Sequence, residues 1–304
     1  MLRIAYCGYD YYSNCLAALL ARDDVQVLKV FACGNKRLSH TVIKLAKQHH
    51  VPWQLKRISD EDVTRLFAEQ RCDYIISAAY AFKIPIGRHR GLNIHPTLLP
   101  VGRGAWPFHK IILDGYAVSG VTIHKLTEQF DAGDIILQRS FPLDERETQD
   151  TLHCKSQMLG LELLKEWLER PEELWNQAVP QGKGEYWEKT GDQDRTITPI
   201  MNVDYANRLV RAYSNQTILI QTNDGLWFVR DAICQLSEPA PAPGTILYAM
   251  NGYLVVAIQD GVLYASGAGR ADEKGSHSSN QTGGMQSMMR GGLHRCRRFL
   301  KRFM

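Results

Sequence analysis

Short apolar runs and longer stretches with apolar residues every three or four positions alternate along the first 170 residues. The short runs predict buried strands, and the longer periodic stretches predict helices with one buried side. The predicted strands are 2–7, 25–31, 72–80, 91–95 and 119–126. The predicted helices are 15–20, 39–50, 60–70, 108–115 and 148–169. Strand, helix and strand in succession are typical of βαβ units, so we predict an α/β fold with a parallel-rich sheet.

The pattern changes after Pro171. The stretch Pro180-Gln-Gly-Lys-Gly-Glu-Tyr186 has the composition of a linker, and a helix at 203–213 follows it. Strand-like runs come next, at 217–222, 226–229, 244–249, 253–259 and 261–266. Asn-Asp-Gly and Gln-Asp-Gly between these runs are hairpin signals. We therefore predict an α/β domain at 1–175, a linker at 176–200, a small C-terminal β-rich domain at 201–266 and a flexible basic tail at 267–304.

The composition narrows the class of protein. With 44% hydrophobic and 22% charged residues, the chain can bury a substantial core. No apolar run approaches the roughly 20 residues that a membrane span requires, and the start lacks the pattern of a signal peptide. The seven cysteines are scattered and show no C-x-x-C spacing, which is typical of free thiols in a reducing compartment. We expect a cytoplasmic protein.

Charge is distributed unevenly along the chain. The formal net charge is +4, but residues 289–304 contain six cations and no acid, so the remainder is slightly acidic. A slightly acidic body argues against a polyanion such as RNA as its main partner. The tail is either a solvated end or a segment that touches phosphates, anionic lipid or RNA.

The candidate chemistry lies in two short segments. Asn93 and His95 occupy alternate positions of a predicted strand, so their side chains point to the same face. A carboxamide beside an imidazole suits acyl transfer, because the amide can stabilise an oxyanion while the imidazole moves a proton. Asp131 follows the next strand and could orient the imidazole and favour its cationic form. Alternatively, this is only a polar strand end and an Asp-Gly turn.

The longer pattern resembles the folate-dependent formyltransferase family. It comprises Asn93-Ile-His-Pro-Thr-Leu-Leu-Pro100, Arg103-Gly104, Gly120-Val-Thr-Ile123 and Asp131-Ala-Gly-Asp134. The resemblance implies a Rossmann-like formyltransferase domain whose catalytic residues are Asn93, His95 and Asp131. A weaker likeness to the C-terminal domain of methionyl-tRNA and some sugar formyltransferases is carried by Arg208-Leu-Val-Arg-Ala-Tyr213 and Pro243-Gly-Thr-Ile-Leu247.

The same resemblance implies 10-formyltetrahydrofolate as co-substrate. The residues expected to bind it are Phe82, Lys83, Ile84, Ala105, Thr127, Glu128, Gln129, Phe130 and Asp131. The histidines and cysteines show no metal-binding spacing, so we expect no metal. We interpret His124 as structural. Gly8 and Asp10 are either a tight turn with a helix cap or part of the acceptor site, and we favour the first.

The predicted function is N-formyl transfer to the amine of a small molecule. We place a nucleotide-linked amino sugar first, because residues 31–39 are short and hold only two cations where tRNA formyltransferases carry a basic insertion. The alternatives are a hydroxyornithine or amino-acid formyltransferase and a methionyl-tRNA formyltransferase. A non-catalytic folate- or RNA-binding protein is the alternative from another class. A homodimer is compatible with the sequence.

Overall fold

The computed structural model describes residues 1–271 of the chain, apart from 33 and 35, and it divides into two compact units. Unit 1 comprises Met1–Pro107, Ala117–Leu143 and Leu152–Lys189. Unit 2 comprises Phe108–Tyr116, Asp144–Thr151 and the described residues from Thr190 onward. Most of the predicted tail, from residue 272, lies outside the described residues.

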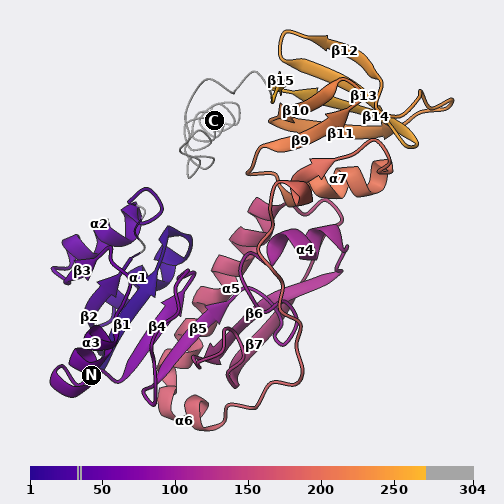
Figure 1. Cartoon of the computed structure of the whole chain (residues 1–304). Coiled ribbons are helices and arrows are strands. Elements are labelled where there is room, and N and C mark those ends of the chain that lie inside the picture. Colours follow the sequence, from indigo (N-terminus) through magenta and orange to yellow (C-terminus); the bar gives the residue numbers. More distant parts are fainter. Residues whose placement is uncertain (33, 35, 272–304) are drawn as a thin grey trace, which may run out of the picture. The chain divides into compact units, whose positions relative to one another are not determined.

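A seven-stranded sheet forms the centre of unit 1, with the order β3-β2-β1-β4-β5-β6-β7 (Figure 1). The first five strands in this order run parallel, and β6 and β7 run antiparallel to their neighbours. The strands are β1 (Leu2–Gly8), β2 (Val25–Phe31), β3 (Trp53–Gln54), β4 (Tyr74–Ala78), β5 (Gly91–His95), β6 (Val118–Lys125) and β7 (Ile135–Pro142). The mixed α/β class with a parallel-rich sheet is confirmed.

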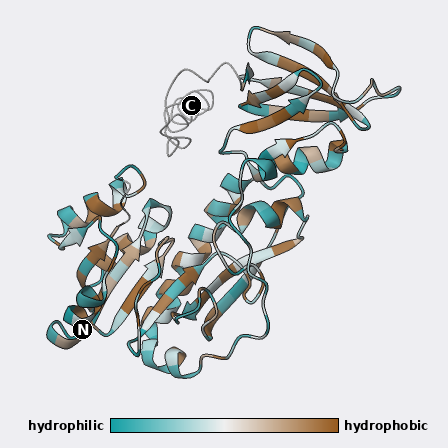
Figure 2. Ribbon diagram, in the orientation of Figure 1, coloured by the Kyte–Doolittle hydropathy of each residue, from teal (hydrophilic) through white to brown (hydrophobic). Residues whose placement is uncertain are grey.

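Helices cover both faces of this sheet. Three of them pack on one face, namely α1 (Ser13–Leu20), α2 (His40–Gln48) and α5 (Gln149–Glu169). The opposite face is covered by α3 (Asp60–Thr64), its π-helical continuation Arg65–Glu69, and the segment that follows β4. β4 is buried along its whole length, as expected for a central strand, and hydrophobic residues concentrate on the strands in Figure 2. Each large aliphatic side chain buried here contributes about 1.5–3 kcal/mol.

The turn after β1 allows close packing of backbone and a helix cap. A Cβ at Gly8 would lie 2.6 Å from the carbonyl oxygen of Ala78, so only glycine fits there. Asp10 opens a short 3-10 helix (Asp10–Tyr12), and its Oδ1 accepts the backbone N–H groups of Thr41 at 2.8 Å and Val42 at 2.9 Å. Asp10 is thus a helix cap, but it caps α2 rather than the helix that directly follows it.

Residues 179–187, which we call the strap, lie in the predicted linker but are paired with the body of unit 1. Val179 exchanges two backbone hydrogen bonds with Ile135, at 2.8 and 2.9 Å. Arg103 N–H donates to the carbonyl of Glu185, and Trp187 N–H donates to the carbonyl of Arg103 at 2.7 Å. Trp187 is also buried. The structure therefore places residues 176–189 in unit 1, unlike the predicted linker, because backbone hydrogen bonds and a tryptophan anchor them there. Upstream of the strap lies α6 (Pro171–Asn176).

Unit 2 contains two four-stranded sheets, with the orders β15-β10-β9-β8 and β11-β14-β13-β12. Their strands are β8 (Thr196–Ile197), β9 (Ile218–Thr222), β10 (Gly225–Val229), β11 (Asp231–Leu236), β12 (Ile246–Met250), β13 (Tyr253–Ile258), β14 (Gly261–Ser266) and β15 (Gly269–Arg270). The helices of the unit are α4 (Phe108–Leu113), the 3-10 turn Gln193–Arg195 and α7 (Val203–Ala212). Ordered strands thus continue beyond the predicted boundary at 266, because β15 pairs with β10.

The described residues were compared with what a membrane-spanning helix, a reactive thiol and a metal site require. None of their helices has the length and apolarity needed to cross a membrane. Burial raises the pKa of the thiols of Cys15, Cys72 and Cys234 to about 12, which leaves them unreactive. No group of three or more His, Cys, Asp or Glu side chains within this part of the chain is arranged to hold a metal ion.

Candidate active site

Asn93 and His95 project from β5 toward the face of the sheet that α3 covers. Leu92 and Ile94, which alternate with them, pack into the core on the other face. The loop after β5 folds back beside the strand, and the carbonyl of Gly102 accepts a hydrogen bond from His95 Nε2 at 2.8 Å. The imidazole is therefore held at the sheet surface, where it is only 4% exposed.

Asp131 lies in the loop between β6 and β7, and its carboxylate reaches the same place. Its Oδ1 lies 3.5 Å from His95 Nδ1 and 3.3 Å from Asn93 Nδ2. Its Oδ2 accepts the backbone N–H of Gly104 at 2.9 Å. Gly104 has φ +106°, and a Cβ there would lie 2.5 Å from the carbonyl oxygen of Trp187, so the loop needs glycine at this point. The structure thus brings together the three residues that were predicted to be catalytic.

Burial and hydrogen bonding set the protonation states. Burial alone would raise the pKa of Asp131, but the nearby charge of His95, the contact with the His124 ring and the N–H of Gly104 hold it well below its ordinary value. Burial lowers the pKa of His95, and the Asp131 carboxylate opposes that shift only in part. At neutral pH the pair is therefore a carboxylate and a neutral imidazole. The predicted preference for a cationic imidazole is outweighed by desolvation.

The hydrogen bond to Gly102 also fixes the tautomer of His95. A carbonyl oxygen can only accept, so Nε2 carries the proton. Nδ1 then has the free lone pair and faces the Asp131 side of the site. The proton-accepting atom of this imidazole is therefore Nδ1, and a proton taken up there would sit beside a carboxylate.

His124 belongs to this site, although we interpreted it as structural. Its Nε2 lies 3.2 Å from Asn93 Nδ2 and 3.4 Å from Asp131 Oδ1, while its Nδ1 donates to the carbonyl of Lys125 at 2.9 Å. In the sequence, His124 lies one strand position away from the end that meets the site, which favoured a structural role. The antiparallel register of β5 and β6 instead sets His124 directly opposite Asn93. Paired residues of adjacent strands share a face of the sheet.

The residues predicted to bind folate form two facing segments. Lys83 makes an ion pair with Glu128 at 2.7 Å, which joins the segment after β4 to the β6–β7 loop. Thr127 Oγ1 donates to the carbonyl of Gln129 at 2.8 Å and shapes that loop. Ile84 is buried, whereas the rings of Phe82 and Phe130 are 37% and 47% exposed. Ala105 lies beside Gly104 in the loop that reaches Asp131, and it is exposed.

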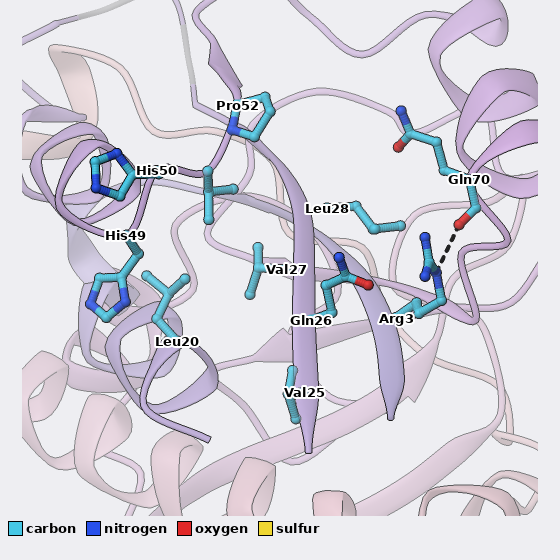
Figure 3. A pocket seen from close by; sticks show the side chains of 11 residues that line it. Arg3, Leu20, Val25, Gln26, Val27, Leu28, His49, His50, Pro52 and Gln70 are labelled. Atoms are coloured by element: carbon cyan, nitrogen blue, oxygen red, sulfur yellow. Dashed lines mark hydrogen bonds between the residues drawn. The ribbon is translucent and has the colours of Figure 1, made fainter. Parts of the chain in front are cut away.

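A pocket of about 450 Å³ lies against these segments. Its walls are Arg57, Ile58, Ser59, Asp60, Lys83, Pro85, Gly87 and Glu128. Another hollow of about 470 Å³ lies at the amino ends of β1 and β2, where Arg3, Gln26, His49 and His50 surround it (Figure 3). Ligands of open α/β sheets bind at the carboxyl ends of the strands. The pocket lined by Lys83 and Glu128 is therefore the better candidate, because Lys83 lies in the segment that follows β4.

An amide, an imidazole and a carboxylate that meet at one point of an α/β sheet are the groups that acyl transfer can use. Residues 25–168, just under half of the chain, match the formyl transferase family. A methionyl-tRNA formyltransferase of Staphylococcus aureus (strain bovine RF122 / ET3-1) is 27% identical over 307 residues. That alignment covers 96% of this chain and 99% of the relative.

Solved structures share the fold. An N-formyltransferase from Helicobacter canadensis, in complex with folinic acid and dTDP-3-aminofucose, superimposes with a TM-score of 0.65 at 17% identity. That match covers 88% of this chain and 99% of the other. HypX from Aquifex aeolicus, in complex with tetrahydrofolic acid, gives a TM-score of 0.61 at 19% identity over 87% of this chain. The match spans 43% of the length of HypX.

Proposed function

We propose that the protein transfers a formyl group from 10-formyltetrahydrofolate to the nitrogen of an amine. The observation that carries this proposal is the convergence of Asn93, His95 and Asp131 in a chain that matches the formyl transferase family. Folate compounds named with the Helicobacter and Aquifex structures support the choice of donor.

The residues of the predicted folate site fit this donor. Exposed aromatic rings at Phe82 and Phe130 offer apolar surface for a flat pterin, and Ile84 adds a buried apolar wall. Arg57 and Lys83 line the adjoining pocket, and they suit the carboxylates of a glutamate tail if Lys83 exchanges its ion pair with Glu128 for one with the ligand. When bound, the donor supplies the activated formyl group.

His95 is the residue that accepts and then donates the proton in this proposal. Its neutral Nδ1 accepts a proton from the attacking amine, and the ionised Asp131 carboxylate stabilises the resulting imidazolium. The same proton can then pass to the departing nitrogen of the donor. Because Asp131 is ionised throughout, it acts through its charge and does not itself take up the proton.

Asn93 stabilises the negative charge that develops on the formyl oxygen. Its Nδ2 now donates to His124 Nε2 and Asp131 Oδ1 over 3.2 and 3.3 Å. Hydrogen bonds of this length are weak, so one can be exchanged for a stronger bond to a charged oxygen. An oxyanion donor of this kind contributes about 3 kcal/mol to lowering the barrier.

The acceptor in this proposal is a small amine, with a nucleotide-linked amino sugar as first choice. Within its described residues, unit 2 carries twelve acidic and seven basic side chains, which disfavours a large polyanion. Residues 31–39 add only Lys36 and Arg37. The dTDP-3-aminofucose bound to the Helicobacter enzyme shows that this fold can accommodate such a substrate.

Methionyl-tRNA is the second candidate acceptor. The observation that favours it is the extent of the Staphylococcus match, which spans nearly the whole of both chains, including the C-terminal part. An ornithine-type amine comes third, since no contact in the site selects it.

A single assay tests both the reaction and the acceptor. The full chain is incubated with 10-formyltetrahydrofolate and, separately, with nucleotide-linked amino sugars, hydroxyornithine and charged initiator tRNA. Mass spectrometry then detects the gain of one formyl group, with His95→Ala as the matched control. Transfer to an amino sugar supports the first choice, and transfer only to tRNA or hydroxyornithine replaces it. No transfer to any amine, with intact folate binding, would favour a non-catalytic binding protein.

A further inference from the structure

The strap carries one side chain that reaches the backbone of the Asp131 loop. Gln181 Nε2 donates to the carbonyl oxygen of Asp131 at 3.0 Å and to that of Gly133 at 2.6 Å. Gln181 Oε1 accepts from Arg103 Nε at 3.2 Å and from Arg103 Nη2 at 2.9 Å. All polar atoms of this amide thus have partners that fix its orientation, because a guanidinium can only donate and a carbonyl can only accept.

Arg103 connects this amide to both ends of the candidate catalytic pair. Its neighbour Gly102 accepts from His95 Nε2, and its other neighbour Gly104 donates to Asp131 Oδ2. The guanidinium also donates to the carbonyl of Gly182 at 3.0 Å. His95, the 102–104 loop, Gln181 and Asp131 therefore form a closed ring of contacts. A shift of any member changes the separation of His95 and Asp131.

Asp131 needs such support because its backbone is in a sparsely populated conformation. Its φ is +53°, in the left-handed region that non-glycine residues seldom adopt. Residues in that region keep their conformation only where the surroundings hold them there. The two bonds from Gln181 fall on the carbonyl of Asp131 and on that of Gly133, which close the turn on either side of Ala132.

We infer that Gln181 is a positioning residue for formyl transfer, which holds the Asp131 turn so that its carboxylate faces Nδ1 of His95. The inference rests on the proposed function for its effect on turnover. Gln181 reaches Asp131 only through the backbone and takes no part in the chemistry. Arg103 orients the amide, and the strap is the segment that delivers it.

Three substitutions separate positioning from simple packing. Gln181→Met keeps the length of the side chain without its polar atoms. Gln181→Glu keeps an acceptor for Arg103 but replaces the donor with an oxygen that faces two carbonyl oxygens. Gln177→Ala is the matched control, since Gln177 lies just before the strap and its Nε2 donates to Glu173 Oε1, at 3.4 Å, on its own side of the strap. We expect Gln181→Met and Gln181→Glu to lower kcat about 10- to 100-fold, with KM for the folate donor changed less than about threefold. The control should match the wild type.

The titration of His95 gives a readout that a structural role would not move. The Asp131 carboxylate raises the pKa of His95 against the effect of burial, so a displaced Asp131 should let that pKa fall further. NMR titration of the imidazole in the wild type, Gln181→Glu and the control measures this without any acceptor. If the wild type formylates nothing but the His95 pKa falls in Gln181→Glu, the positioning role stands while the proposed function fails. Unchanged kcat and unchanged His95 titration in folded Gln181→Met and Gln181→Glu would overturn the inference. So would a loss of kcat that matches a loss of folded protein.

Discussion

His124 lies directly opposite Asn93 across the antiparallel pair β5–β6, with its Nε2 3.2 Å from Asn93 Nδ2. Because Nδ1 of the same ring donates to the carbonyl of Lys125, Nε2 is the acceptor for the amide. His124 therefore determines which way the carboxamide of Asn93 points. Without that acceptor, the amide could turn its oxygen toward the place where negative charge develops.

This relationship predicts a loss of turnover without a loss of donor binding when His124 is changed. His124→Phe keeps the ring volume in a buried site but removes the acceptor. We expect kcat to fall about 10- to 100-fold while the Kd for the folate donor stays within about threefold. Steady-state kinetics and fluorescence titration with folate measure the two. His49→Ala, at the exposed end of α2, is the control and should behave as wild type. A fully active, folded His124→Phe would show that Asn93 needs no such partner.

The proton role of His95 predicts a more severe effect. His95→Ala removes the acceptor Nδ1, and Asp131→Asn removes the charge that stabilises the imidazolium. Each should reduce turnover at least ~100-fold while folate binding stays within an order of magnitude. In the wild type, activity should fall with decreasing pH as His95 becomes protonated, with a midpoint below 6.5 because burial lowers its pKa. Near-native turnover of His95→Ala, or a midpoint above 6.5, would contradict this mechanism.

The fold of the first half could be predicted because its strands are buried. β1, β2 and β4 read as apolar runs, and their order follows from βαβ connections. β7 was not predicted, because it is an edge strand that exposes Gln138, Arg139 and Ser140. β11 was not predicted for the same reason, because Cys234 is the one buried residue of this strand. Apolar periodicity fails where a strand has little to bury.

The candidate site could be predicted only in part. Asn93, His95 and Asp131 carry a recognisable spacing, and the structure brings them together. Gln181 carries no such signal, because its role depends on where the chain returns after α6. The glycine and lysine residues around Gln181 have the composition of a linker. The nearby Trp187, which is buried, is the signal that could have indicated an anchored segment. A local sequence pattern does not show where a distant segment of the chain will contact the site.

Removal of residues 272–304 should leave turnover on a small amine nearly unchanged. The candidate site and the strap lie within residues 1–187, and β15 ends at Arg270, so truncation after Ala271 preserves the described strands. We expect kcat and KM within about twofold of the full chain, since no group in the proposed chemistry is removed. Single-turnover kinetics of the truncated, folded protein check this. A slower chemical step would mean that the removed segment belongs to the site.

His153 predicts a pH-dependent stability. Burial lowers the pKa of His153 to about 4, whereas an unfolded histidine titrates near 6.5. Between these values the unfolded chain binds a proton that the folded chain refuses, so the free energy of unfolding decreases as pH falls from about 6.5 to 4. The full effect is about 3 kcal/mol.

His153→Phe keeps a ring against Tyr11, whose centroid lies 4.5 Å away, and removes the titration. Urea unfolding of both proteins at pH 7.5 and 5.0 should show the wild type losing more stability than the variant, and parallel losses would refute the assignment.

The acceptor classes differ most in their dependence on salt. A tRNA substrate needs several phosphate contacts, and its binding weakens by about 10³- to 10⁵-fold between 50 and 200 mM salt. A nucleotide-linked sugar offers two phosphates, so its KM should rise no more than about tenfold over the same range. Within the described residues of unit 2, the twelve acidic against seven basic side chains favour the shallow dependence, as do the two cations in residues 31–39. We therefore expect measurable formylation of at least one nucleotide-linked amino sugar, weakly dependent on salt, and none of charged initiator tRNA. Efficient, steeply salt-dependent turnover of the tRNA by the purified full chain would reverse this choice of acceptor. It would leave the roles of Asn93, His95 and Asp131 as proposed, because the chemical step is the same for either amine.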